Sequence, residues 1–150
     1  MNRILTVLIL FSLLFACKEP IPYPDDGTSI WQDTSKKPFY HSVASGDPLP
    51  DKVIIWTRAT PENKGEIPVK WKMATDETMK EVIKSGQVTT DSTSDYTVKI
   101  DVDGLSPSTH YYYQFEALGA KSDVGRTKTS STEGDSETKF AIVSCSNFEA

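Results

Sequence analysis

The sequence is poor in the residues from which metal and nucleophilic sites are built. Its 150 residues contain two cysteines, Cys17 and Cys145, and two histidines, His41 and His110. No metal-ligand spacing links the two histidines, so no zinc-type site is predicted from them. A glycine-rich phosphate loop is also missing, because Gly46 lacks the companion glycines that such a loop needs. We therefore interpret both histidines as structural or exposed side chains.

Basic runs are absent as well. The chain has 16 basic and 21 acidic residues, which gives a formal net charge of −5. Proteins that bind nucleic acid concentrate Lys and Arg on one face or segment, so nucleic acid is not an expected partner. Aromatic residues make up 10% and charged residues 25% of the chain, which is a globular composition. The length suffices for one domain of ordinary size, which we expect to be monomeric.

A long apolar run is present only at the N-terminus. Residues 4–15 are apolar apart from two hydroxyl residues, and Arg3 precedes them. The run is too short to span a bilayer comfortably and is typical of a secretory signal. The following Leu14-Phe15-Ala16-Cys17 resembles a bacterial lipobox, which implies cleavage before the cysteine and diacylglycerol on its sulfur. A chance cysteine in an ordinary signal peptide and an uncleaved anchor are the alternatives.

We thus expect a lipoprotein signal peptide over residues 1–16 and an exported protein held by lipidated Cys17. Its membrane could be the outer or the cytoplasmic membrane; Lys18 after the cysteine favours the outer one, with the domain in the periplasm or at the cell surface. Residues 17–38 are rich in proline and predict an extended tether. Lipidation would leave Cys145 without a disulfide partner in the chain. Such a lone thiol in an exported protein is either buried and inert or bound to something.

After the tether, the pattern changes to short strands with turn signals between them. About seven strands are expected, and no convincing helix. This spacing predicts an antiparallel β-sandwich of the fibronectin type III or immunoglobulin kind over residues 39–131. The segment 78–84 is ambiguous between a helical turn and a strand. The expected strands are residues 39–44, 53–58, 69–74, 86–90, 96–102, 111–117 and 124–129.

One local pattern makes the sandwich more specific. Gly104-Leu-Ser-Pro-Ser-Thr-His-Tyr111 resembles the connection into the sixth strand of fibronectin type III domains. The hydroxyl of Tyr111 is expected to bond to upstream backbone, as in a tyrosine corner, which is a structural role. Trp56 and Trp71 are expected to be core residues on facing strands. Asp47, between a glycine and a proline, is expected to cap a turn.

The end of the sequence differs from the rest. Residues 132–138 are polar and predict a linker. The continuous apolar run Phe140-Ala-Ile-Val143 then leads into Ser144-Cys145-Ser146-Asn147. A run without alternation is typical of a strand buried on both faces, and α/β proteins place their chemistry at the ends of such strands. Residues 139–150 therefore predict the start of a truncated second domain of the α/β class.

Taken together, these segments closely resemble the N-terminal part of the alkaline phosphatase D (PhoD-like) family over residues 39–148. The segments that carry the resemblance are Phe39-Tyr-His-Ser-Val-Ala-Ser-Gly-Asp-Pro48, Asp51-Lys-Val-Ile-Ile-Trp-Thr-Arg58, Val69-Lys-Trp-Lys-Met-Ala-Thr-Asp76, Asp95-Tyr-Thr-Val-Lys-Ile-Asp-Val102, Gly104-Leu-Ser-Pro107, Tyr111-Tyr-Tyr-Gln-Phe115, Val124-Gly-Arg-Thr-Lys-Thr129 and Val143-Ser-Cys-Ser-Asn147.

The resemblance implies a two-domain exported enzyme that hydrolyses phosphate mono- and diesters with iron and calcium. It implies a β-sandwich followed by a metallophosphoesterase-like catalytic domain. Cys145 matches the family cysteine whose thiolate binds the iron. The other ligands are expected among Asp, Asn, His and Tyr residues of the catalytic domain. No catalytic residue is therefore expected within this piece, which alone should be inactive.

Two other interpretations stay open. The chain could be a free-standing fibronectin-like surface lipoprotein that binds a partner, or the product of a decayed gene. A free-standing module has no use for a buried-type strand ending in Ser-Cys-Ser-Asn, and exposing that strand would invite aggregation.

Overall fold

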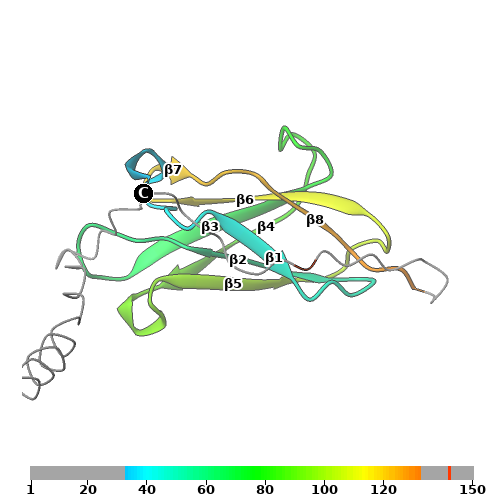
Figure 1. Cartoon of the computed structure of the whole chain (residues 1–150), viewed down its shortest axis with the longest axis horizontal. Helices are drawn as coiled ribbons and strands as arrows, with labels where there is room; N and C mark the ends of the chain where they lie inside the picture. Colours follow the sequence, from blue (N-terminus) through cyan, green and yellow to red (C-terminus); the bar gives the residue numbers. More distant parts are fainter. Residues whose placement is uncertain (1–32, 133–141, 143–150) are drawn as a thin grey trace, which may run out of the picture. The chain divides into compact units, whose positions relative to one another are not determined.

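The computed structural model describes residues 33–132 and residue 142. The chain divides into two compact units, Met1–Gln32 and Asp33–Ala150, and all described residues belong to the second. Between residues 33 and 132 the chain forms two antiparallel β-sheets and no α-helix (Figure 1). The all-β sandwich predicted from the sequence is thus confirmed. Its elements are η2 (Thr34–Lys36), β1 (Val43–Gly46), β2 (Val53–Arg58), β3 (Ile67–Ala74), β4 (Val82–Thr90), η3 (Ser92–Ser94), β5 (Thr97–Val102), β6 (His110–Ala117), β7 (Ala120–Lys121) and β8 (Gly125–Lys128).

The two sheets differ in size. The smaller one has the strand order β1-β2-β5, and the larger one has the order β4-β3-β6-β7. Strand β8 also pairs with β6, at the opposite end of that strand from β7. Every pairing is antiparallel, so short connections can join neighbouring strands.

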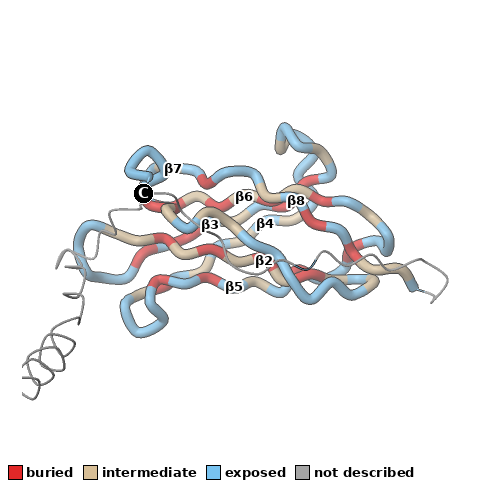
Figure 2. Tube along the Cα trace, viewed as in Figure 1, coloured by how far each residue is buried: buried red, intermediate tan, exposed pale blue. Residues whose placement is uncertain are grey.

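The core lies between the sheets and follows alternation along the strands, interrupted in β3 by a register shift between Met73 and Ala74. β2 alternates buried and half-buried positions, and β6 does the same from Tyr111 to Ala117 (Figure 2). Tyr113 is 2% exposed, and its ring lies against the backbone of β8. A Cβ atom on Gly125 would come within 2.3 Å of its Cζ atom. The glycine therefore allows β8 to close over a buried aromatic ring.

Several strand ends differ from the prediction. Residues 39–42 form a turn closed by Ser42 N–H donating to Phe39 O (2.9 Å), so β1 starts at Val43 and extends to Gly46. The ambiguous segment 78–84 is neither wholly helix nor wholly strand. The carboxylate of Asp76 accepts hydrogen bonds from the backbone of Lys80 (3.2 Å) and Glu81 (2.6 Å), which holds a turn before β4. The expected strand 86–90 is the second half of β4.

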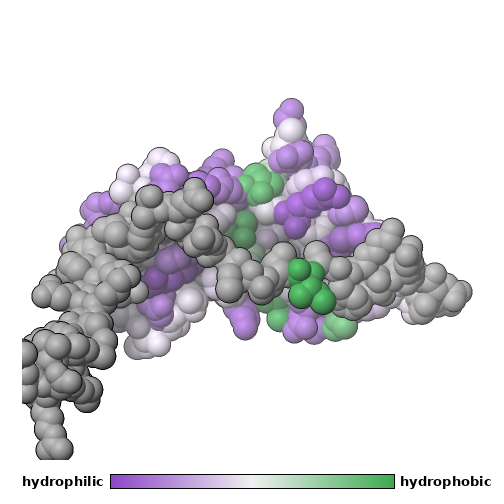
Figure 3. Space-filling view, in the orientation of Figure 1, coloured by the Kyte–Doolittle hydropathy of each residue, from purple (hydrophilic) through white to green (hydrophobic). Residues whose placement is uncertain are grey.

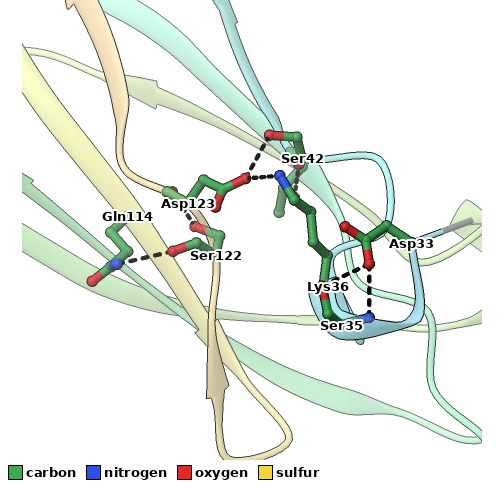
Figure 4. A network of polar contacts seen from close by, with 8 residues as sticks. Asp33, Ser35, Lys36, Ser42, Gln114, Ser122 and Asp123 are labelled. Atoms are coloured by element: carbon green, nitrogen blue, oxygen red, sulfur yellow. Dashed lines mark hydrogen bonds and ion pairs between the residues drawn. The ribbon is translucent and has the colours of Figure 1, made fainter.

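The end of the predicted tether is folded onto the sandwich. Asp33 caps η2 by accepting from Ser35 N–H at 2.9 Å, and Lys36 Nζ donates to Asp123 Oδ2 at 2.7 Å (Figure 4). Pro38 is buried, and its carbonyl accepts from Thr60 N–H at 2.9 Å. The expectation of an unpaired extended backbone is therefore wrong for residues 33–38. Residues 1–32 lie outside the described part of the chain.

Candidate functional site

The two residues predicted to carry chemistry are not described by the structure. Cys17 lies before the described range, and Cys145 lies after it. The same holds for the signal peptide (1–16) and for nearly all of the linker and the start of the second domain. Lipidation at Cys17 and iron binding at Cys145 therefore stay predictions. Within the described residues, no helix is both long and apolar enough to cross a membrane.

The described residues do not form a metal site. Within residues 33–132 there is no group of three or more His, Cys, Asp or Glu side chains that could hold a metal ion. His41 and His110 are exposed and lie against arginines instead. Arg58 Nη1 is 2.9 Å from Nε2 of His41, and Arg126 Nη2 is 2.8 Å from Nε2 of His110. The iron and calcium implied by the resemblance do not fit these residues and would need ligands from other parts of the chain.

The environment of His110 favours its neutral form. This residue starts β6 and pairs with Lys128 of β8. Partial desolvation lowers the pKa of His110 below its ordinary value of 6.5, and the positive charges of Arg126 and then Lys128 lower this pKa further. A neutral imidazole can accept the hydrogen bond from Arg126. The histidine is thus a neutral side chain beside the positive charges of Arg126 and Lys128 on β8.

The tyrosine corner is present. The side chain of Tyr111 is 3% exposed, and its hydroxyl accepts a hydrogen bond from Ser106 N–H at 2.8 Å. The side chain of Thr129 donates to the carbonyl of the same Ser106 at 2.7 Å. Leu105 is 7% exposed and packs in the core beside them. The structural role predicted for Tyr111 is therefore confirmed.

The two tryptophans lie in different environments. Trp71 on β3 is half-buried and packs against the core, where a Cβ atom on Gly86 would come within 2.8 Å of its Nε1 atom. Trp56 lies on the outer face of β2, because Val53, Ile55 and Thr57 occupy the inward positions. The prediction that Trp56 is a core residue is wrong. It lines a hollow of ≈ 240 Å³ on the outer face of the smaller sheet.

Asp47 does not cap a turn through its side chain. No donor among the described residues forms a hydrogen bond with its carboxylate, and its φ of 49° places it in the left-handed region. The connection from β1 to β2 is held by backbone, with Leu49 N–H donating to Lys52 O at 2.9 Å. The predicted role is therefore wrong for Asp47.

Sequence reasoning missed a group of positive charges on the outer face of the larger sheet. The visible surface carries mainly hydrophilic residues, with hydrophobic ones in small patches (Figure 3). On the outer face of this sheet, β3, β7 and β8 carry five exposed basic residues. The outward positions of all its five strands carry one carboxylate, Glu116. We call this surface the cationic sheet face. Its basic residues are Lys70, Lys72, Lys121, Arg126 and Lys128.

Comparison with known proteins decides the family. The family model "PhoD-like phosphatase, N-terminal domain" matches residues 26–131, which include nearly the whole described sandwich. The chain belongs to the PhoD-like phosphatase family. Alkaline phosphatase D of Bacillus subtilis (strain 168) is 37% identical over 124 residues, which are 77% of this chain and 21% of that protein. The resemblance found in the sequence is therefore confirmed.

One solved structure agrees with the PhoD-like assignment. A structure titled "Structure of PhoD" is 38% identical and has a TM-score of 0.63, with 68% of this chain and 21% of that chain covered. The fibronectin type III domain of the human collagen alpha-1(XX) chain is 17% identical, with a TM-score of 0.39 over 81% of this chain and all of that domain. This chain thus spans about a fifth of the length of the PhoD-like relatives.

Proposed function

We propose that this chain is the N-terminal portion of an exported, lipid-anchored hydrolase of phosphate mono- and diesters. The observation that carries the proposal is the identity to alkaline phosphatase D, 37% over 124 residues. Identity of that size across a whole domain supports a shared role for the domain and not merely a shared fold. The free-standing binding module has no comparable support.

The sandwich itself would hold and orient the catalytic part. The described residues offer no metal cluster, and several of their titratable groups form ion pairs at the surface. The cofactor part of the proposal is therefore limited to Cys145, whose thiolate is a ligand type that iron accepts. Metal ions bound in the complete enzyme would polarise the phosphoryl oxygens of the ester.

A domain exchange tests the proposal. Residues 26–131 of this chain would replace the matching segment of Bacillus subtilis alkaline phosphatase D. Hydrolysis of nitrophenyl phosphate would then be measured against the unaltered enzyme. We expect the exchanged enzyme to keep most of its activity, because a domain that is 37% identical should preserve much of the surface that meets the catalytic part. A second exchange, with the fibronectin type III domain of human contactin 1, is the control and should lose most of it.

The outcome that contradicts the proposal is clear. Equal loss of activity in both folded exchanges would show that this domain does not serve a phosphatase.

The purified 150-residue chain, given iron and calcium, should release no nitrophenol above the buffer blank. Anchoring is tested separately. The mass of the purified N-terminus should show diacylglycerol in the natural chain and none after Cys17→Ser.

A further inference from the structure

The cationic sheet face stands out against the charge of the rest of the molecule. It carries five basic residues and one carboxylate, Glu116, whereas acidic residues outnumber basic ones over the remainder of residues 33–132. The only ion pair on this face joins Lys70 Nζ to Glu116 Oε1 at 3.6 Å, within the described residues. Lys72, Arg126 and Lys128 have no carboxylate partner there. The face therefore keeps a net positive charge in an acidic chain.

The chain enters the sandwich beside this face. Lys36 binds Asp123, which lies in the connection between β7 and β8, and Asp123 also accepts from Ser42 Oγ at 3.4 Å (Figure 4). Strands β7 and β8 both belong to the larger sheet. The N-terminal connection is thus fixed next to the strands that carry Lys121, Arg126 and Lys128.

The tether would keep the sandwich near the bilayer. Residues 18–32 span at most about 50 Å when fully extended, so a domain anchored at Cys17 stays within that distance of the lipid. Basic residues close to an anionic membrane surface are each attracted to it, and the attraction falls off within a Debye length. Several such residues on one rigid sheet act together.

We propose that the cationic sheet face docks on the anionic headgroups of the membrane that holds the lipid anchor. The inference rests on the anchoring at Cys17 that forms part of the proposed function. The sandwich then lies with its larger sheet toward the lipid and the outer face of β1-β2-β5 toward solvent. Docking fixes how the chain after Thr132 is oriented relative to the membrane. The tether sets only its distance from the membrane.

Lysine acylation of the full chain in vesicles tests the docking. The chain is reconstituted through its N-terminus in phosphatidylcholine alone or mixed with phosphatidylglycerol, and mass spectrometry follows the labelling rate of each lysine. We expect Lys70, Lys72 and Lys128 to label several-fold more slowly in anionic vesicles, while Lys64 and Lys99 label at unchanged rates. About 0.5 M salt should abolish the protection, because the Debye length falls to a few ångströms.

Matched variants separate the face from total charge. The triple change Lys70→Glu, Lys72→Glu, Lys128→Glu should abolish the protection that remains at Lys121. The control Lys64→Glu, Lys80→Glu, Lys99→Glu has the same net charge, alters exposed lysines elsewhere and should keep that protection.

The remaining outcomes separate docking on the membrane from anchoring and from binding to a soluble acidic polymer. Chain that floats with both kinds of vesicle is anchored, and lysine labelling rates that are the same in neutral and anionic vesicles would then overturn docking alone. Chain that fails to float would overturn the anchoring and docking together. Protection by dissolved poly-glutamate, without protection by anionic vesicles, would replace the membrane with a soluble acidic polymer and overturn the assignment.

Discussion

Tyr111 joins three parts of the sandwich through a single hydroxyl group. Its ring is buried on β6, its oxygen accepts from Ser106 N–H, and Ser106 is bonded in turn to Thr129 beyond the end of β8. The Leu-Ser-Pro-Ser-Thr-His-Tyr spacing predicts this contact because the loop is short and the tyrosine returns directly over it. The role is local, which is why sequence suffices to find it.

The change Tyr111→Phe should lower the free energy of unfolding by about 1 kcal/mol. The ring still fills the core, but Ser106 N–H loses its acceptor and must turn to water, which reaches this exposed residue. Urea unfolding measures the difference. Tyr112→Phe is the matched control, because that hydroxyl lies on the outer face, and we expect it to change stability by less than about 0.5 kcal/mol. Equal losses in both variants would contradict the assigned hydrogen bond.

The pairing of strands β6 and β8 gives His110 a cationic environment that neither strand has alone. Register places His110 opposite Lys128, and the next pair on the same face joins Tyr112 to Arg126. The cations that surround the histidine come from a segment sixteen or more residues further along the chain. Their field is the reason that desolvation and charge act in the same direction on the imidazole.

The pKa of His110 should therefore lie below 6.5, and proton NMR of its ring across pH 4–8 measures it. Arg126→Gln should raise the pKa, and high salt should raise it only in part, because desolvation remains. Between the folded and the unfolded pKa, His110 binds fewer protons in the folded state than in the unfolded state. The contribution of His110 to stability is thus present above the unfolded pKa and lost as pH falls through the folded pKa. A pKa above 6.5 would contradict the placement of Arg126 and Lys128 beside the imidazole.

For the molecule as a whole, the sandwich begins before its first strand. Phe39 is 2% exposed, and the segment before it is held by the Lys36–Asp123 contact. Every residue of the hydrophobic core cluster lies between Phe39 and Ala117. The stability of the described unit should therefore depend on Phe39 and the segment before it, in addition to the strands.

Replacing Phe39 with alanine should lower the free energy of unfolding by about 3–5 kcal/mol, because a buried aromatic ring leaves a cavity. Leu118→Ala serves as the control, since Leu118 is 54% exposed in the turn between β6 and β7. Thermal unfolding of the full chain compares the two. If Phe39→Ala were as mild as Leu118→Ala, the segment that leads into β1 would not be part of the stable sandwich.

The sequence alone determined the fold class, the family and the tyrosine corner, because period-2 alternation and short loop motifs are local. The sequence could not decide which of the two alternating sets of side chains on a strand faces inward. Trp56 and Ile55 were equally suited to the core, and packing against the second sheet placed Ile55 inside. The packing of residues 33–38 and the cationic sheet face likewise depend on the tertiary structure. Both arise from contacts between segments distant in sequence, and only the folded chain brings those segments together.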